Sequence, residues 1–256
     1  QIMDVLSTQV QPALVGNLRL ANLVTRDYQS GIFQKGDTVN VPLPPVLTAN
    51  NIAETGSVST QNPAPGNVQV RLNQHIEATF NIPDVLAAIS NVDQMQQYLA
   101  PAVVALAERV ETDLFALYPR FSVSVGSTGA AITEAVVDAA DKALFDAKVP
   151  DGLQRFLALA STPYSTLRNL GRLSEAQTIG SGDAIVSGNV GTCKGFGVFR
   201  SQYATTLSGP IYHGIAFVPQ AMALVTRQLP DVIAGSGAIS RDINYNGLSM
   251  KLVMSY

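Results

Sequence analysis

The side chains best suited to catalysis are few in this sequence and stand far apart. Two histidines and one cysteine occur among 256 residues. His75 falls on the polar side of an alternating stretch, and Cys193 precedes Lys194, whose charge predicts a lowered thiol pKa. Triads are recognised by geometry, so a small serine hydrolase built around His213 stays an alternative. Neither histidine lies in a known motif. We interpret both as surface or interface residues, and the cysteine as an unreactive loop residue.

Acidic side chains form groups only where helices are expected. Glu108, Glu111 and Asp113 share one predicted helix, and Asp138 and Asp141 share another. A metal ion needs several oxygen ligands that converge on one point, and neither group offers that. We interpret both groups as solvated helix faces, and we expect no metal and no cofactor.

Sequence motifs for nucleotide, nucleophilic or zinc chemistry are missing. The chain contains no G-x-S-x-G, no G-x-G-x-x-G, no H-E-x-x-H and no phosphate loop ending in Gly-Lys-Ser/Thr. The glycine cluster Gly191–Gly197 includes Lys194 but has the wrong spacing for phosphates, so we interpret it as a turn. The sequence therefore predicts a protein that is not an enzyme and has no catalytic residues.

Composition points to protein partners. Charged residues make up 14% of the chain, and the formal net charge is −3. A globular domain typically has about 25% charged residues, and an acidic balance argues against a surface that grips phosphates. One cysteine excludes an intrachain disulfide, and no apolar run approaches the roughly 20 residues of a membrane span. The first residues lack the order of a signal peptide, so we expect synthesis in a cytoplasm and no membrane contact.

Residues 34–82 carry the clearest pattern. Apolar and polar residues alternate in Asp37–Leu43 and again in Val68–Ile82, which predicts two half-buried strands. The second strand would span roughly 50 Å at about 3.3 Å per residue, so it would run past its own domain. Pro44–Asn67 between them is rich in Pro, Gly, Asn and Ser, with little apolar surface to offset its ordering entropy. We predict a projecting two-stranded arm with a large flexible tip.

The remaining chain divides into further segments. Residues 1–33 are interpreted as an N-terminal arm. A helix is expected over 91–118 within the segment 83–120, with a capping box at Ser90, a kink or break at Pro101 and an apolar face. The inward positions of that face are Val103, Leu106, Ala107, Val110, Leu114 and Leu117.

Residues 121–220 read as a compact mixed domain. We expect helices over 133–148 and 162–170, strands over 155–160, 196–200 and 214–218, a glycine-rich loop over 180–191 and a helical turn over 219–225. In residues 221–256, two strands, 239–245 and 248–254, are joined at Asn246-Gly247, a strong hairpin signal. The fold class predicted from these elements is α+β.

This order of segments resembles the major capsid proteins of tailed bacteriophages that share the Hong Kong 97 fold. The stretch LANLVTRDYQSGIFQKGDTVNVPLPP (20–45) is similar to the family's entry from arm to extended loop, and LAERVETDLFALY (106–118) to the end of its spine helix. STPYSTLRNL (161–170), followed by GNVGTCKGFGVFRS (188–201), is similar to a helix and strand of its axial domain.

The resemblance implies an N-terminal arm (1–33), an extended loop (34–82), a spine helix (83–120), an axial domain (121–220) and peripheral strands (221–256). It also implies a subunit that assembles with itself, as hexamers and pentamers, into an icosahedral shell around double-stranded DNA. The shell would form in the host cytoplasm, with scaffolding, portal or decoration proteins as further partners and only weak nonspecific contact to DNA. Candidate contacts between subunits are Pro44, Asn51, Glu54, Gln61 and Arg71.

Two features qualify the resemblance. Some members of the family form an isopeptide bond between a loop lysine and a peripheral-domain asparagine, but Pro44–His75 contains no lysine, so this covalent bond is not expected. A shell protein of the same fold could also build an encapsulin-like nanocompartment, which neighbouring cargo genes in place of tail genes would indicate.

Overall fold

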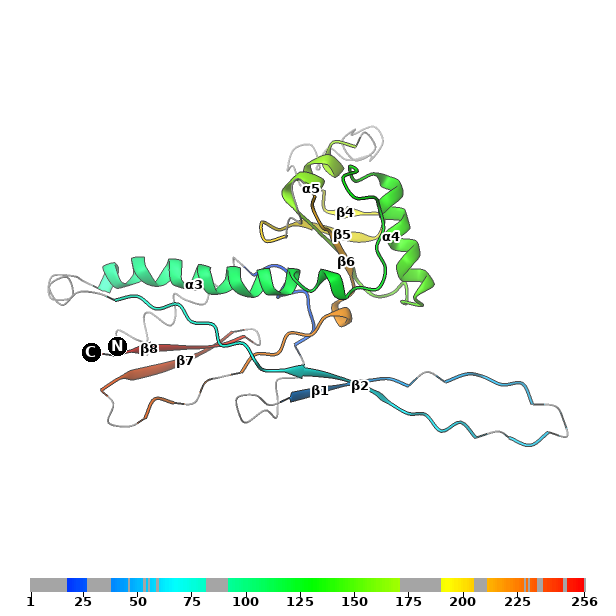
Figure 1. The fold of residues 1–256 in the computed structure, drawn as a ribbon, viewed down its shortest axis with the longest axis horizontal. Coiled ribbons are helices and arrows are strands. Elements are labelled where there is room, and N and C mark those ends of the chain that lie inside the picture. Colours follow the sequence, from blue (N-terminus) through cyan, green and yellow to red (C-terminus); the bar gives the residue numbers. More distant parts are fainter. Residues whose placement is uncertain are drawn as a thin grey trace. The chain divides into compact units, whose positions relative to one another are not determined.

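The computed structural model is an α+β fold (Figure 1) and describes residues 18–26, 38–45, 47–52, 54, 56–58, 60–81, 92–170, 190–204, 211–227, 229, 231–233, 237–245 and 248–255. Two compact units are present. The first comprises Gln1–Thr25 and Ile76–Leu224, and the second comprises Arg26–His75 and Val225–Tyr256. Each unit is therefore assembled from segments that lie far apart in the sequence.

A four-stranded mixed sheet forms the centre of the first unit. Its strands are β3 (Arg155–Leu159), β4 (Thr192–Cys193), β5 (Phe196–Arg200) and β6 (Ile215–Phe217), in the order β4-β5-β3-β6. β5 runs parallel to β3, whereas β6 is antiparallel to β3 and β4 is antiparallel to β5. The three longer strands confirm the predictions to within a residue or so, but the short β4 was read as part of a loop.

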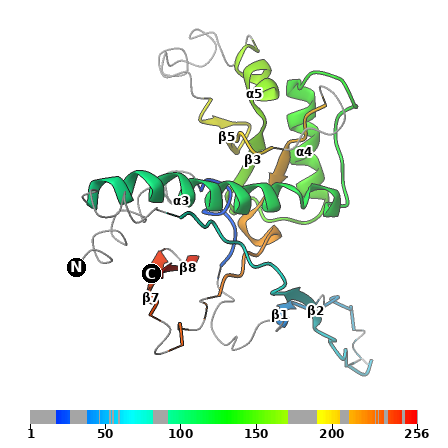
Figure 2. The same ribbon diagram turned by 60° about the vertical axis from the view of Figure 1, so that its left-hand side comes forward.

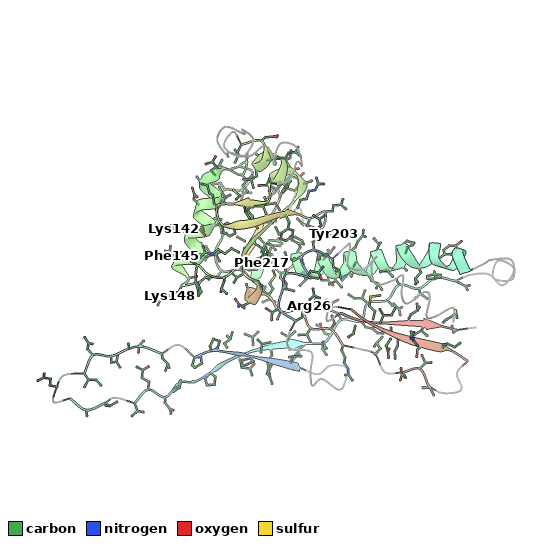
Figure 3. All side chains as sticks on the ribbon, turned by 180° about the vertical axis from the view of Figure 1, so that it is seen from behind. Arg26, Lys142, Phe145, Lys148, Tyr203 and Phe217 are labelled. Carbon is green, nitrogen blue, oxygen red and sulfur yellow. The ribbon has the colours of Figure 1, made fainter. Side chains whose placement is uncertain are left out.

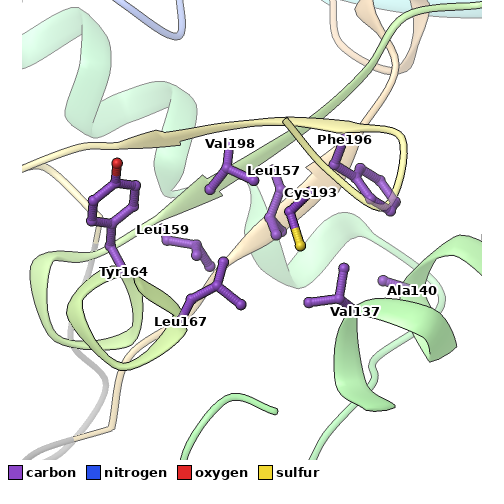
Figure 4. Packing of buried hydrophobic residues seen from close by; sticks show 9 residues of the cluster. All are labelled: Val137, Ala140, Leu157, Leu159, Tyr164, Leu167, Cys193, Phe196 and Val198. Carbon is purple, nitrogen blue, oxygen red and sulfur yellow. The ribbon is translucent and has the colours of Figure 1, made fainter. Parts of the chain in front are cut away.

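Two helices contribute to the core on this sheet. They are α4 (Glu134–Asp146) and α5 (Ser161–Arg168), both at their predicted places. Side chains from the two helices pack with strand residues in one buried cluster, shown in Figure 4. The cluster consists of Val137, Ala140, Leu157, Leu159, Tyr164, Leu167, Cys193, Phe196 and Val198. The short helical turn Pro219–Ala221 (η2) also lies within its predicted range.

The long helix α3 (Val92–Phe115) is continuous through Pro101, as both ribbon views show (Figures 1 and 2). A break at this proline was the wrong expectation. The proline costs one backbone hydrogen bond, but it lies on an exposed face. Buried side chains before and after it, Leu99 and Val103, hold both sides of the helix against the unit. A short 3₁₀ turn, η1 (Tyr118–Arg120), follows the helix, and Ser90 lies outside the described residues.

The second unit contains two antiparallel strand pairs. β1 (Thr38–Leu43) pairs with β2 (Gly66–Arg71), and β7 (Ile239–Tyr245) pairs with β8 (Leu248–Met254). The terminal strands match their predicted limits, although the turn residues between them lie outside the described part of the chain, as do 1–17 and most of the glycine-rich loop.

The predicted length of the second arm strand was wrong. β2 has six residues, not the whole of Val68–Ile82, because its partner β1 is also only six residues long. A strand can extend its ladder only while a partner offers hydrogen bonds, and Pro44-Pro45 follows directly after β1.

Candidate assembly surface

One face of the β1–β2 ribbon is apolar and incompletely covered. The register places Val39 opposite Val70 and Val41 opposite Val68, while the alternate positions carry polar side chains such as those of Asn40 and Gln69. Val39 is buried, but Val68 is 47% exposed. A two-stranded ribbon has no second layer of its own, so an apolar face gains stability only when another surface covers it.

Side-chain alternation continues beyond the hydrogen-bonded strand. From Leu72 to Phe80 the even-numbered positions are mostly half-buried, while the odd-numbered ones are exposed. The final aromatic ring of this run, Phe80, stacks on Tyr98 of α3, with ring centroids 5.9 Å apart. The predicted faces were therefore right even though the predicted strand was too long. The end of this segment therefore contacts helix α3 of the first unit and has no partner strand among the described residues.

The tip between the strands closes on itself through one side chain. The amide oxygen of Gln61 accepts a hydrogen bond from the Thr48 N–H at 3.1 Å, and its amide nitrogen donates to the Thr48 carbonyl oxygen. The side-chain amide of Gln61 thus makes the same pair of hydrogen bonds to Thr48 that the backbone of a neighbouring strand would make. The large apolar side chains around it stay exposed, with Ile52 at 53% and Val58 at 76%. In the described part of the tip, 44–65, no hydrophobic residue is buried.

The five candidate contact residues lie along this arm. Pro44, Asn51 and Glu54 are exposed, Gln61 is half-buried against Thr48, and Arg71 is exposed at the end of β2. Nothing in the described residues joins the five to one another by a hydrogen bond or an ion pair. They form an extended surface and no pocket.

Glu111 is a residue whose place in the fold the sequence interpretation missed. It was placed on a solvated helix face, but it is fully buried. One carboxylate oxygen accepts a hydrogen bond from the Leu20 N–H at 3.1 Å, and the other accepts from the Ala21 N–H at 3.0 Å. A carboxylate on α3 therefore holds the backbone of the N-terminal segment.

The electrostatics of Glu111 reflect two opposed effects. Burial raises the pKa of its carboxyl group, while the N–H groups that it accepts from, and the charge of Arg19, act to lower it. A signal for the burial of Glu111 exists in the sequence, since Val103, Ala107, Glu111 and Leu114 continue one helix face at spacings of four, four and three. An acid on an apolar stripe is buried only when donors satisfy it.

The N-terminal segment is fixed at a second point. The Thr25 N–H donates to the carbonyl oxygens of Pro219 (3.2 Å) and Met222 (3.1 Å), and the Leu224 N–H donates to the Thr25 carbonyl oxygen. At the first anchor, Leu20 and Ala21 are fully buried. The described part of the predicted N-terminal arm is thus integrated into the core of the first unit.

The acidic pair on α4 is solvent-accessible, as interpreted, but both carboxylates also form ion pairs. Asp138 forms an ion pair with Lys194 at 2.6 Å, and Asp141 pairs with Arg155 of β3. The Arg155 side chain is largely buried and also pairs with Asp151 at 2.5 Å. These pairs tie α4 to the sheet, which is a structural role.

The candidates for chemistry do not converge. Cys193 is a buried residue on β4, where burial raises the pKa of its thiol more than the charge of Lys194 lowers it. His213 stacks on Tyr118 with ring centroids 4.2 Å apart, and His75 is exposed on the arm. A search of the described residues finds no group of acidic, histidine or cysteine side chains that could hold a metal ion. Among the same residues, no helix is long and apolar enough to cross a membrane.

The fold is similar to that of chains in three solved bacteriophage structures. A chain titled "Mycobacterium phage Che8" matches with a TM-score of 0.66 and 20% identity, covering 92% of this chain and 84% of its own. A chain of "Capsid structure of the Cyanophage P-SCSP1u" matches at 0.61 and 16% identity, covering 90% and 78%. A chain of "Asymmetric unit of bacteriophage PhiM1 mature capsid" matches at 0.59 and 9% identity, covering 88% and 77%. No protein-family model and no curated protein matches the sequence.

Proposed function

We propose that this chain is the major capsid protein of a tailed bacteriophage, a structural subunit that builds the virion shell. The observation that carries the proposal is the shared fold, which extends over about nine tenths of the chain in three phage structures, two of them titled as capsids. The scattered positions of His75, His213 and Cys193 support a structural role over catalysis. The five-part division expected from the Hong Kong 97 fold belongs to the same proposal.

Self-assembly is supported by the arm itself. The ribbon exposes half of Val68 and Leu43, and the tip exposes Leu47, Ile52 and Val58. Full burial of a fully exposed side chain of this kind contributes about 1.5–3 kcal/mol, and these partly exposed side chains would each gain about half of that or somewhat more. In a closed shell, symmetry repeats each contact in every subunit, so modest contacts add up. We infer that neighbouring copies cover this surface, with Pro44, Asn51, Glu54, Gln61 and Arg71 among the contacts.

Other partners follow from the same proposal. A net charge of −3 supports containment of DNA by the shell wall with only weak, nonspecific contact. Scaffolding, portal and decoration proteins would bind the shell in addition to copies of this chain, and assembly would take place in the host cytoplasm.

Sedimentation velocity tests the proposal against a hydrolase around His213. The wild-type protein should form particles far larger than any small oligomer. A variant in which Ala49–Gly66 is replaced by an Asn-Gly turn should keep a cooperative unfolding transition but sediment as a small species, since the tip adds little buried surface within its own subunit. Wild-type protein that stays a small oligomer under all assembly conditions, or full-sized particles from the shortened variant, would count against it.

A further inference from the structure

Three residues at the end of α4 form an exposed basic-aromatic patch. Lys142, Phe145 and Lys148, labelled in Figure 3, are all exposed, and Phe145 is 62% exposed. They follow one another at intervals of three residues, so the ring lies between two ammonium groups. Single exposed hydrophobic residues are common in proteins and call for no explanation by themselves. The backbone at Lys148 gives a second, independent reason to examine this patch.

Lys148 occupies a conformation that favours glycine. Its φ is +60°, and it ends the helix with its N–H donating to Phe145 O (2.8 Å) and the Val149 N–H donating to Leu144 O (3.1 Å). A left-handed non-glycine residue costs about 1–2 kcal/mol. A cation at a helix C-terminus returns only about 0.3–1 kcal/mol. The helix end by itself therefore does not favour lysine over glycine at this position.

The two ammonium groups are also available for a contact outside the helix. The neighbouring carboxylates Asp138 and Asp141 are engaged by Lys194 and Arg155. Within the part of the chain that the structure describes, neither Lys142 nor Lys148 has an ion-pair partner. An anion that docks here would therefore displace no existing salt bridge.

The tip of the arm offers the matching chemistry. Glu54 is the only ionisable side chain between Pro44 and Asn67, and it lies between the exposed residues Ile52 and Val58. One carboxylate among apolar side chains complements one aromatic ring between two ammonium groups. A polyanion such as DNA fits less well, because the exposed Asp146 stands beside the patch and would repel a run of phosphates more than a single carboxylate.

We propose that the tip of one copy docks on the α4 patch of a second copy, with Glu54 between Lys142 and Lys148 and its apolar neighbours on Phe145. This contact rests on the proposed shell function and specifies where part of the arm surface is covered. Ion pairs of this kind fix the register of an interface more than its affinity. The apolar contact supplies the adhesion, and the charges select the site.

Cysteine cross-linking between two singly substituted proteins tests the contact. The native Cys193 is buried, so Glu54→Cys and Lys148→Cys each introduce one accessible thiol. Co-assembled particles of the two variants should give a disulfide-linked dimer on a non-reducing gel. Arg168→Cys, at an exposed position on α5, replaces Lys148→Cys in the matched control and should give at least tenfold less dimer. Since each parent carries only one new thiol, the dimer band reports contact between copies.

A charge exchange provides the second arm of the test. Glu54→Lys and the double change Lys142→Glu with Lys148→Glu should each lower the yield of particles at least fivefold, and their combination should restore it. Circular dichroism melts near wild type would show that the variants fold. Shells without the cross-link, or a charge exchange without restoration, would overturn the contact while leaving the shell function intact. If α4 charge reversal left particles and cross-links normal and reduced only DNA retention, the patch would bind nucleic acid and the proposal would be wrong. Wild-type protein that builds no shells would refute the function itself.

Discussion

The carboxylate of Glu111 gives the sharpest prediction from the buried structure. Substitution Glu111→Gln keeps the size and shape of the side chain but replaces one acceptor oxygen with an amide N–H₂ group. Either the Leu20 or the Ala21 N–H, which now have acceptors at 3.1 and 3.0 Å, would then face a donor. A buried donor without a partner costs about 1–3 kcal/mol. The amide is easier to bury than the carboxylate, which offsets part of this cost. We expect a loss of about 2 kcal/mol, roughly thirtyfold in the folding equilibrium.

Two assays on the unassembled subunit measure this loss. Urea unfolding gives the free energy, and amide hydrogen exchange gives the site. The Leu20 and Ala21 amides should exchange faster in Glu111→Gln, whereas the Thr25 amide should change less, because it donates to Pro219 and Met222. The matched control is Glu108→Gln, one turn earlier on the exposed face. Glu108 accepts a hydrogen bond from the Tyr203 hydroxyl at 3.2 Å, which an amide oxygen can also accept.

The control variant Glu108→Gln should lose little stability. Glu108→Gln should stay within about 0.5 kcal/mol of wild type, as substitutions on a surface usually do. If Glu111→Gln were equally mild, or if its loss left the Leu20 and Ala21 amides protected, the carboxylate would not be what holds the N-terminal segment.

Three further predictions follow. Because burial raises the folded-state pKa of Glu111, the folded state binds more protons than the unfolded state. The stability of wild type relative to Glu111→Gln should therefore fall as pH rises from the usual glutamate pKa of about 4.3 towards the raised pKa. Urea titrations that show the opposite slope would contradict this. Particles boiled in denaturant should run as one monomer band on a gel, since the loop has no lysine for an isopeptide bond, and a ladder of cross-linked species would overturn this. The variants His75→Ala and His213→Ala should both form particles. His213→Ala removes the stacking on Tyr118, which should lower the free energy of unfolding by about 0.5–1.5 kcal/mol. Complete loss of particles in either folded variant would show that a histidine is essential.

Local sequence patterns predicted the elements well because the relevant forces act over short distances. The alternation around Val39 and Val70 indicated the faces of the arm, and Asn246-Gly247 indicated the pairing of the last two strands, which the structure forms as an antiparallel pair. The length of β2, in contrast, could not be predicted from its own pattern. It depended on the length of β1 and on Pro44-Pro45, so a periodic pattern on one strand could not determine where pairing ends.

Long-range partners explain what the sequence did not reveal. Glu111 lies 91 residues from Leu20, and nothing near the helix indicates that backbone donors will come from the N-terminal segment. The environment of Cys193 was likewise set by burial in a core that distant elements complete, which outweighs the charge of the adjacent Lys194. The contact candidates on the arm were predicted as a class of surface, and the partners proposed for them belong to other copies, which a local pattern in one chain does not indicate.

Electron microscopy of the purified wild-type protein tests the shell function most directly. We expect closed particles with icosahedral symmetry. In the reconstructed wall, the arm of each copy should cover a neighbour, and the density of the tip should lie against another copy. Uniform small oligomers without a closed wall, under conditions where the protein is folded, would contradict it.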